Sequence, residues 1–348
     1  MYRPNTTWTW AFLLTSLLQA IVALALEAYI FARFQLSLKK NANILPQSRT
    51  IPTYLSVFMF GYIYQMVLVY DALRLKNTIQ VIGLCIYNLG ILVYASIQID
   101  QINDAVMVLQ ENGLILIEFW GEIKPFLIVE PCLMAFGTVL MSFVAWKLYD
   151  EFAWTIYKHI SADLRLKRRY LTYQARLQHM SHAVIYIAML KFDFFFFLGF
   201  TVQFLVVVGN TTDAEFYLTI AAVPITILLL VLAAYWTRKE NIIGMIAIIV
   251  IYFAALAYFL FKLVRMYGSD KSRVNDYLPA RRSLTTFAVI TIALLLVTIV
   301  VACQCTHNFN KGLKPHLARR KVPDLDEQKY TTEMPAIAGP VPSRMTID

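Results

Sequence analysis

Ionisable side chains inside long apolar runs are the residues of this sequence best suited to chemistry. Glu130 stands beside Pro131 in one run, and Lys191 and Asp193 lie two positions apart in another. If these runs are membrane helices, a charge at the helix centre costs about 2.5–3.5 kcal/mol on insertion scales, so such groups usually face a cavity or a partner. Side chains of this kind could bind protons, other ions or a polar substrate.

Structural ion pairing is the alternative explanation for the same residues. Lys191 and Asp193 point to different sides of a helix and are poor partners for each other. Asp71 and Arg74, which end another run at a comparable depth, are better partners for them. Glu130 shares its predicted side of the membrane with Glu27 and Lys262. All these groups lie nearer the ends of their runs than the middle, which favours interface positions and one ion pair on each side. The candidate intramembrane polar sites are Glu130, Lys191, Asp193, Asp71 and Lys262.

The elements that must position these residues are eight apolar stretches, each long enough to cross a hydrocarbon core about 30 Å thick. Of the 348 residues, 59% are hydrophobic and 15% are charged, and a water-soluble fold cannot hide that much apolar surface. We therefore predict an all-α, polytopic integral membrane protein with a helical bundle over residues 1–305 and no large soluble domain. The predicted helices cover approximately residues 8–31, 53–70, 78–99, 126–146, 183–208, 216–235, 242–261 and 284–303.

The distribution of Lys and Arg predicts how the helices are oriented. The loops and tails on one side hold 19 of these residues and those on the other side hold 11. The richer side should face the cytosol, which places both termini there. Because most of the net charge of +9 lies in loops that flank apolar runs, it indicates membrane topology rather than binding to nucleic acid.

Three segments lie outside the predicted helices and are long enough to matter. Residues 100–125 are expected to form a partly helical cap on the bilayer surface, and the polar, Pro-containing residues 306–348 are expected to be a disordered cytosolic tail. Residues 147–182 have the pattern of a basic amphipathic helix on the cytosolic leaflet. Their charges either bind anionic lipids or cytosolic trafficking proteins, or they only mark the cytosolic side. The basic residues concerned are Lys158, Arg165, Lys167, Arg168, Arg169 and Arg176.

Few other side chains suggest chemistry. Cys303 and Cys305, at the predicted cytosolic end of the last helix, either are palmitoylated or are ordinary interface cysteines. The sequence contains no nucleophile elbow, phosphate-binding loop, zinc-hydrolase helix or dinucleotide fingerprint. We therefore expect no cofactor, and a membrane-embedded enzyme is the class with the least support.

Six phrases of the chain are long and unusual enough to indicate a family. They lie between the end of the second predicted helix and the seventh, and they resemble the fungal Golgi apparatus multi-pass membrane proteins, an uncharacterised protein family. The resemblance implies a fungal source, a multi-pass helical fold and a Golgi location, but neither a reaction nor binding residues. The phrases are Asp71–Gly90, Lys147–Ile160, Ala162–Gln174, Leu190–Phe204, Ala233–Glu240 and Tyr252–Tyr267.

Two classes of function follow from these observations. The favoured one is a trafficking or organising protein of the Golgi membrane that works through its basic connector at 147–182. The alternative is a transporter of a small solute or ion that uses Glu130, Lys191 and Asp193. A water-filled cavity that reaches Glu130 or Asp193 from one side of the membrane would favour transport, whereas a solid bundle in which those groups end in short ion pairs would favour the organising role.

Overall fold

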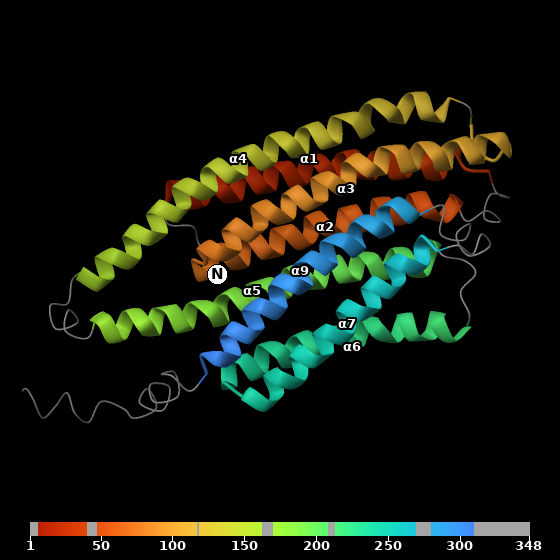
Figure 1. The fold of residues 1–348 in the computed structure, drawn as a ribbon. Coiled ribbons are helices and arrows are strands. Elements are labelled where there is room, and N and C mark those ends of the chain that lie inside the picture. Colours follow the sequence, from red (N-terminus) through yellow and green to blue (C-terminus); the bar gives the residue numbers. More distant parts are fainter. Residues whose placement is uncertain are drawn as a thin grey trace, which may run out of the picture. The chain divides into compact units, whose positions relative to one another are not determined.

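The computed structural model describes residues 6–39, 47–116, 118–161, 170–207, 213–268 and 280–309. This part of the chain is an all-α polytopic membrane protein, and its consecutive helices run in alternating directions (Figure 1). Each of the eight helices is long and apolar enough to cross a membrane. They are α1 (Thr7–Ser37), α2 (Gln47–Leu75), α3 (Thr78–Glu111), α4 (Phe119–Ser161), α5 (Tyr170–Val207), α6 (Asp213–Lys239), α7 (Ile242–Met266) and α9 (Arg281–His307).

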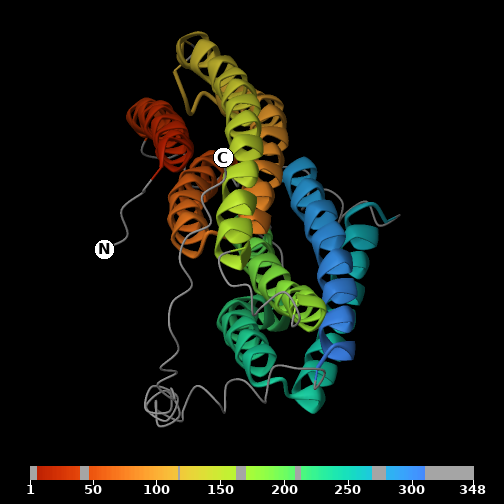
Figure 2. The ribbon, with the colours of Figure 1, turned by 90° about the vertical axis from the view of Figure 1, so that its left-hand side faces the viewer.

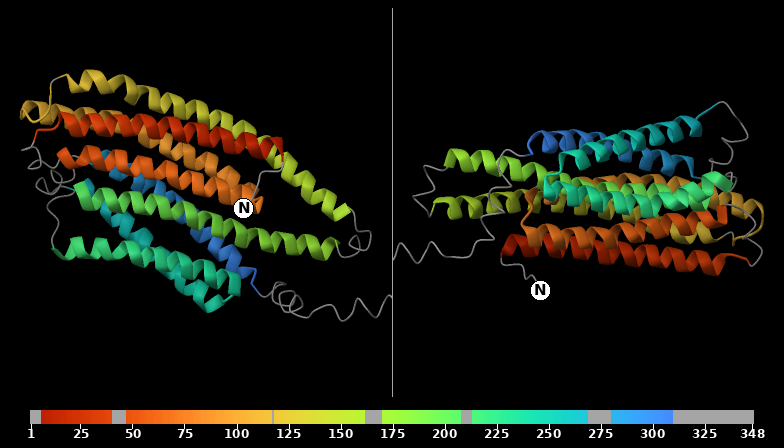
Figure 3. Two further views of the ribbon diagram at one scale, coloured as in Figure 1. Left: turned by 180° about the vertical axis from the view of Figure 1, so that it is seen from behind. Right: turned by 90° about the horizontal axis from the view of Figure 1, so that it is seen from below.

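The helices form two packed halves that meet along α5. In the first half, α1 packs on α2 and α4, and α3 packs on α2 and α4. In the second half, α5 packs on α6 and α9, and α7 packs on α6 and α9 (Figure 2). Contacts of α5 with α2 and α3, and of α9 with α3, join the halves, and the views from behind and below show α5 lying between them (Figure 3).

The seam between the halves is built mainly from aromatic rings. Phe195 of α5 stacks on Phe60 and Tyr64 of α2, with ring centroids 6.1 and 6.0 Å apart. Across the same seam, Tyr94 of α3 meets Phe287 of α9 edge-on at 4.9 Å. Offset and edge-on ring pairs contribute about 0.5–1.5 kcal/mol each beyond the area they bury. Directed bonds also cross the seam, from the Tyr64 hydroxyl to Lys191 O at 2.8 Å and from Gln203 Nε2 to the Tyr94 hydroxyl at 2.9 Å.

Two short connections share one backbone design. Lys76 and Glu240 each take a left-handed conformation, with φ of 49° and 53°, and each is followed by an asparagine. The amide of Asn77 donates to Ala72 O at 3.0 Å, and its side chain accepts from the first turn of α3. Asn241 does the same between α6 and α7. One residue thus closes one helix and caps the next, which explains how both hairpins turn within a few residues.

The helices extend beyond the hydrophobic runs that predicted them. Hydropathy detects only the part of a helix that lies in hydrocarbon, whereas backbone hydrogen bonding continues into polar sequence. The expected surface cap at 100–125 is therefore wrong, because α3 continues to Glu111 and α4 begins at Phe119. The turn between them contains Gly113, whose φ is +64°, and Ile115, which pairs with Leu38 beyond the end of α1.

The basic connector at 147–182 also differs from one separate helix. Its first described part continues α4 to Ser161, and its last part is the beginning of α5 from Tyr170. The described residues of the connector are therefore the ends of two bundle helices. The predicted tail begins at residue 306, and its residues beyond Phe309 lie outside the described part of the chain.

The close contact between α5 and α9 predicts a position where a methyl group destabilises the fold. A Cβ on Gly199 would lie 2.5 Å from Phe287 Cε1, whereas a Cβ on Gly121 of α4 would meet nothing within 4 Å. Both Gly→Ala changes gain helix propensity, but only Gly199→Ala overpacks the core, at a cost of about 1–3 kcal/mol. In detergent, Gly199→Ala should melt below Gly121→Ala. Equal melting temperatures would contradict the packing of this seam.

Candidate functional site

A pair of buried glutamates lies at one end of the first half. Glu27 of α1 is fully buried and Glu130 of α4 is 2% exposed, and the two carboxyl groups are near enough to interact electrostatically. Glu27 Oε2 and Glu130 Oε1 have no hydrogen-bond partner among the described residues. Glu27 Oε1 also accepts a bond of 3.2 Å from Gln98 Nε2 of α3. Among the described residues, no Lys, Arg or His forms a salt bridge with either glutamate. Two adjacent carboxylates repel strongly in an apolar environment, so the pair can hold a proton between them.

Asn88 of α3 is the centre of a second polar cluster, one level further along the bundle. Its Oδ1 accepts from Gln19 Nε2 of α1 at 3.0 Å and from Gln65 Nε2 of α2 at 3.4 Å. Its Nδ2 donates to Thr138 Oγ1 of α4 at 2.8 Å. The hydroxyl of Tyr62 is buried beside Gln19. One amide side chain therefore joins all four helices of the first half.

A third cluster lies where α2 ends and α3 begins. Gln80 Nε2 donates to Leu68 O and to Asp71 Oδ2, both at 3.1 Å. Lys191 of α5 forms an ion pair with Asp71 and donates to Gln80 Oε1 at 3.2 Å. The Tyr64 hydroxyl donates to Lys191 O at 2.8 Å. The pairing of Lys191 with Asp71, which helix geometry favours over a pairing with its neighbour at 193, is present in the structure.

The three clusters together form what we call the polar column. Along α3 the column runs from Gln98 to Gln80, a separation of 18 positions. At 1.5 Å per residue this is about 27 Å, close to the thickness of a hydrocarbon core of about 30 Å. Within the described part of the chain, oxygens of Tyr62, Gln65 and Gln98 have no hydrogen-bond partner. The column consists of Glu27, Glu130, Gln98, Tyr62, Gln19, Asn88, Thr138, Gln65, Gln80, Asp71 and Lys191.

Asp193 belongs to a separate site in the second half. It is 6% exposed, and its Oδ2 accepts a bond of 2.7 Å from Thr298 Oγ1 of α9. Its Oδ1 has no hydrogen-bond partner among the described residues. The side chain lines a cavity of about 70 Å³ between α5, α6, α7 and α9, together with Tyr252 and Thr226. A carboxyl group with a free oxygen beside a cavity can bind a proton or another cation.

The remaining sequence candidates lie elsewhere. The ammonium of Lys262, on α7, lies 3.9 Å from the ring centroid of Phe204, so α7 holds it against α5. Glu130 lies near Glu27 rather than near Lys262. Its helix α4 packs on α1 and α3, whereas α7, which carries Lys262, packs on α6 and α9. Cys303 is exposed and Cys305 is 2% exposed, so palmitoylation stays a prediction and the burial of Cys305 disfavours it there.

The basic connector residues lie at positions that the structure describes only in part or not at all. Lys158 lies in α4 and Arg176 lies in α5, at positions whose side chains the structure does not describe. The other four, Arg165, Lys167, Arg168 and Arg169, lie outside the described residues.

Sequence analysis missed the amides that connect the column. Gln19, Gln65, Asn88 and Gln98 are all at most 4% exposed, and each interrupts an apolar run. Such side chains hydrogen-bond across helices in membranes, so a search for amides as well as charges would have found them. Which of them meet depends on helix rotation, which hydropathy does not report.

The ion pair at the end of the column predicts coupled stabilities. The Lys191 and Asp71 side chains are 27% and 34% exposed, so removal of one leaves the other charge partly buried and unpaired, at a cost of about 1–3 kcal/mol. Lys191→Met and Asp71→Asn should each lower the melting temperature in detergent, and the double variant should lose less than the sum. Lys124→Met, at an exposed position, is the control. Strict additivity of the two losses would contradict the pairing.

Comparison with known proteins identifies one relative. The chain is 33% identical over 327 residues to a UPF0658 Golgi apparatus membrane protein of Schizosaccharomyces pombe, and the alignment covers 88% of each chain. No family model and no solved structure matches the chain.

Proposed function

Because the chain belongs to the UPF0658 family of Golgi apparatus membrane proteins, we propose that it acts in the Golgi membrane as a proton-coupled carrier. The observation that carries the proposal is the pair Glu27 and Glu130, two buried carboxyl groups on the packed helices α1 and α4 that form no salt bridge among the described residues. A structural role alone would be served at lower cost by apolar side chains, since charges inside membranes are expensive.

The polar column supports a path for the proton. Its three clusters, at the glutamate pair with Gln98, around Asn88, and at the Asp71–Lys191 pair, lie at successive levels over nearly the thickness of the hydrocarbon. Side-chain amides cannot relay a proton without water. The unpaired oxygens of Tyr62, Gln65 and Gln98 can accept hydrogen bonds from such water molecules. The path therefore requires water to enter the first half during the transport cycle.

The cavity at Asp193 supports a second binding site for the transported species. Its free carboxyl oxygen lies in a small space that is otherwise lined by apolar side chains and by Tyr252, Thr226 and Thr291. Its volume of about 70 Å³ suits a proton with a few waters or a small cation better than an organic solute. We place the coupling proton at the glutamate pair and a second small cation at Asp193.

Proton movement in reconstituted liposomes tests the role of the pair. The full chain should acidify liposomes that contain a pH-sensitive dye when a membrane potential is imposed. Glu27→Gln and Glu130→Gln remove the exchangeable carboxyl groups but keep the size and hydrogen bonding of the side chains, so each should reduce the flux to that of empty liposomes. Glu111→Gln, at an exposed position at the end of α3, should leave the flux unchanged.

The same variants distinguish a proton site from a purely structural pair. In infrared difference spectra after a pH change, the wild type should show a protonated carboxyl band that Glu130→Gln lacks. Normal flux in the Glu27→Gln/Glu130→Gln double variant would sink the carrier proposal, even if its melting temperature falls.

A trafficking or organising role through the connector is the second candidate. The segment 147–182 carries seven Lys and Arg residues. It joins α4, which ends at Ser161, to α5, which begins at Tyr170. We propose that this side and both termini face the cytosol, where anionic headgroups attract basic residues at about 1 kcal/mol each.

Neutralising the connector tests this candidate. Arg165→Gln, Lys167→Gln, Arg168→Gln and Arg169→Gln together should strip anionic lipid from the detergent-purified protein, as measured by native mass spectrometry, and should shift a fluorescent fusion out of the Golgi. The matched control replaces Lys314, Arg319, Arg320 and Lys321 of the tail by Gln. Equal loss in both variants would show that the connector has no specific role.

A further inference from the structure

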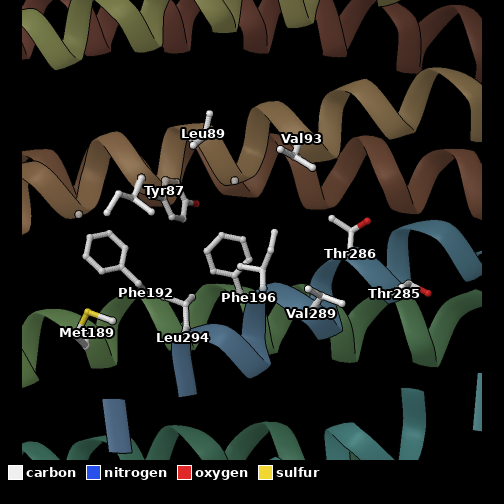
Figure 4. A pocket seen from close by; sticks show the side chains of 14 residues that line it. Tyr87, Leu89, Val93, Met189, Phe192, Phe196, Thr285, Thr286, Val289 and Leu294 are labelled. Carbon is white, nitrogen blue, oxygen red and sulfur yellow. The ribbon is translucent and has the colours of Figure 1, made fainter. Parts of the chain in front are cut away.

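A groove of about 490 Å³ lies between α3, α5 and α9 (Figure 4). It does not include the polar column or the cavity at Asp193. Gly83 and Gly90 of α3, Phe192 and Phe196 of α5, and Thr286 and Val289 of α9 line it. The side chains that face the groove in the close view are almost all apolar.

The two glycines explain how the groove forms. A Cβ on Gly83 would lie 2.5 Å from Phe192 Cε2, and one on Gly90 would lie 3.0 Å from Phe196 Cζ. The phenylalanine rings therefore pack directly on the α3 backbone. The larger residues that flank the glycines rise higher than these rings and form the sides of the groove. Ile86 and Val289 at the groove are 61% and 50% exposed. Because these helices span the membrane, the open side of the groove faces lipid chains rather than water.

A cluster of charged side chains lies beyond one end of the groove. Arg282 precedes Thr286 by one helical turn and so lies on the same face of α9, about 6 Å further along. Its Nη1 is 3.6 Å from Asp100 Oδ2 and 3.8 Å from Asp104 Oδ2 of α3. All three side chains are more than half exposed and are only loosely paired. Both charge signs thus meet where the membrane helix α9 begins, at the depth of lipid headgroups.

We propose that the groove binds one acyl chain of a phosphatidylethanolamine molecule whose headgroup lies on this cluster. The primary ammonium of the lipid would donate to Asp100 and Asp104, and its phosphate would accept from Arg282. A zwitterionic headgroup matches a cluster of mixed sign, whereas an anionic lipid would meet two carboxylates. A choline headgroup fits less well because it has no N–H to donate.

Native mass spectrometry of the full chain tests the site. The purified protein is equilibrated in detergent with equal amounts of phosphatidylethanolamine, phosphatidylcholine and phosphatidylglycerol. We expect the ethanolamine lipid to be retained about fivefold over each of the others, the ratio for an exposed pair of charges. Asp100→Asn with Asp104→Asn should abolish this preference but keep the bound lipid, and Glu118→Gln, nearby and exposed, should change neither.

A bulky side chain in the groove tests whether the acyl chain binds there. Val289→Trp places a large ring in the groove and should abolish retention of lipid. Val139→Trp makes the same change on the lipid-facing side of α4, at 68% exposure, and should retain lipid as the wild type does. If Val289→Trp lowers the melting temperature below that of Val139→Trp, Ile86→Trp takes its place. Wild-type retention in the groove variants, or equal retention of the three lipids by the wild type, would overturn the proposal.

Discussion

The cost of leaving a polar side chain unpaired in hydrocarbon is the constraint on which this structure depends. In the first half it draws four helices together, because the polar groups of each helix find partners mainly on its neighbours. Asn88 shows this most directly, since its amide bonds to α1, α2 and α4 at once. The second half has fewer buried polar groups and packs chiefly through apolar and aromatic side chains, with Asp193 as the main exception.

The two halves therefore offer different chemistry to the membrane. Lys191 lies at the boundary of the two halves. It belongs to α5 of the second half, and its ammonium group pairs with Asp71 in the polar column of the first half. Asp193 is two positions further along α5 and faces the other way, into the cavity of the second half. A single stretch of α5 thus presents one charged group to each half, which is how helical geometry separates residues that are close in sequence.

The number and type of the helices could be predicted from the sequence, because apolar runs of membrane length have few other stable structures. The Lys191–Asp71 pair could be predicted from depth alone. The contact between Glu27 and Glu130 could not, since it requires the rotation of α1 against α4, which no local pattern records. Helix ends were also beyond reach, because α3 and α4 continue through polar sequence that hydropathy treats as loop.

The aromatic seam has a mechanical consequence. Ring contacts between Phe195 and the side chains of Phe60 and Tyr64 tolerate a wider range of angles than hydrogen bonds do, but they weaken quickly when the rings separate. The hydrogen bonds around Asn88 have narrow limits of length and direction and resist the same displacement. A displacement of one half against the other would therefore have to break the directed bonds that cross the seam, from Tyr64 to Lys191 O, from Gln203 to Tyr94 and between Lys191 and Asp71, and these bonds fix the register of the two halves.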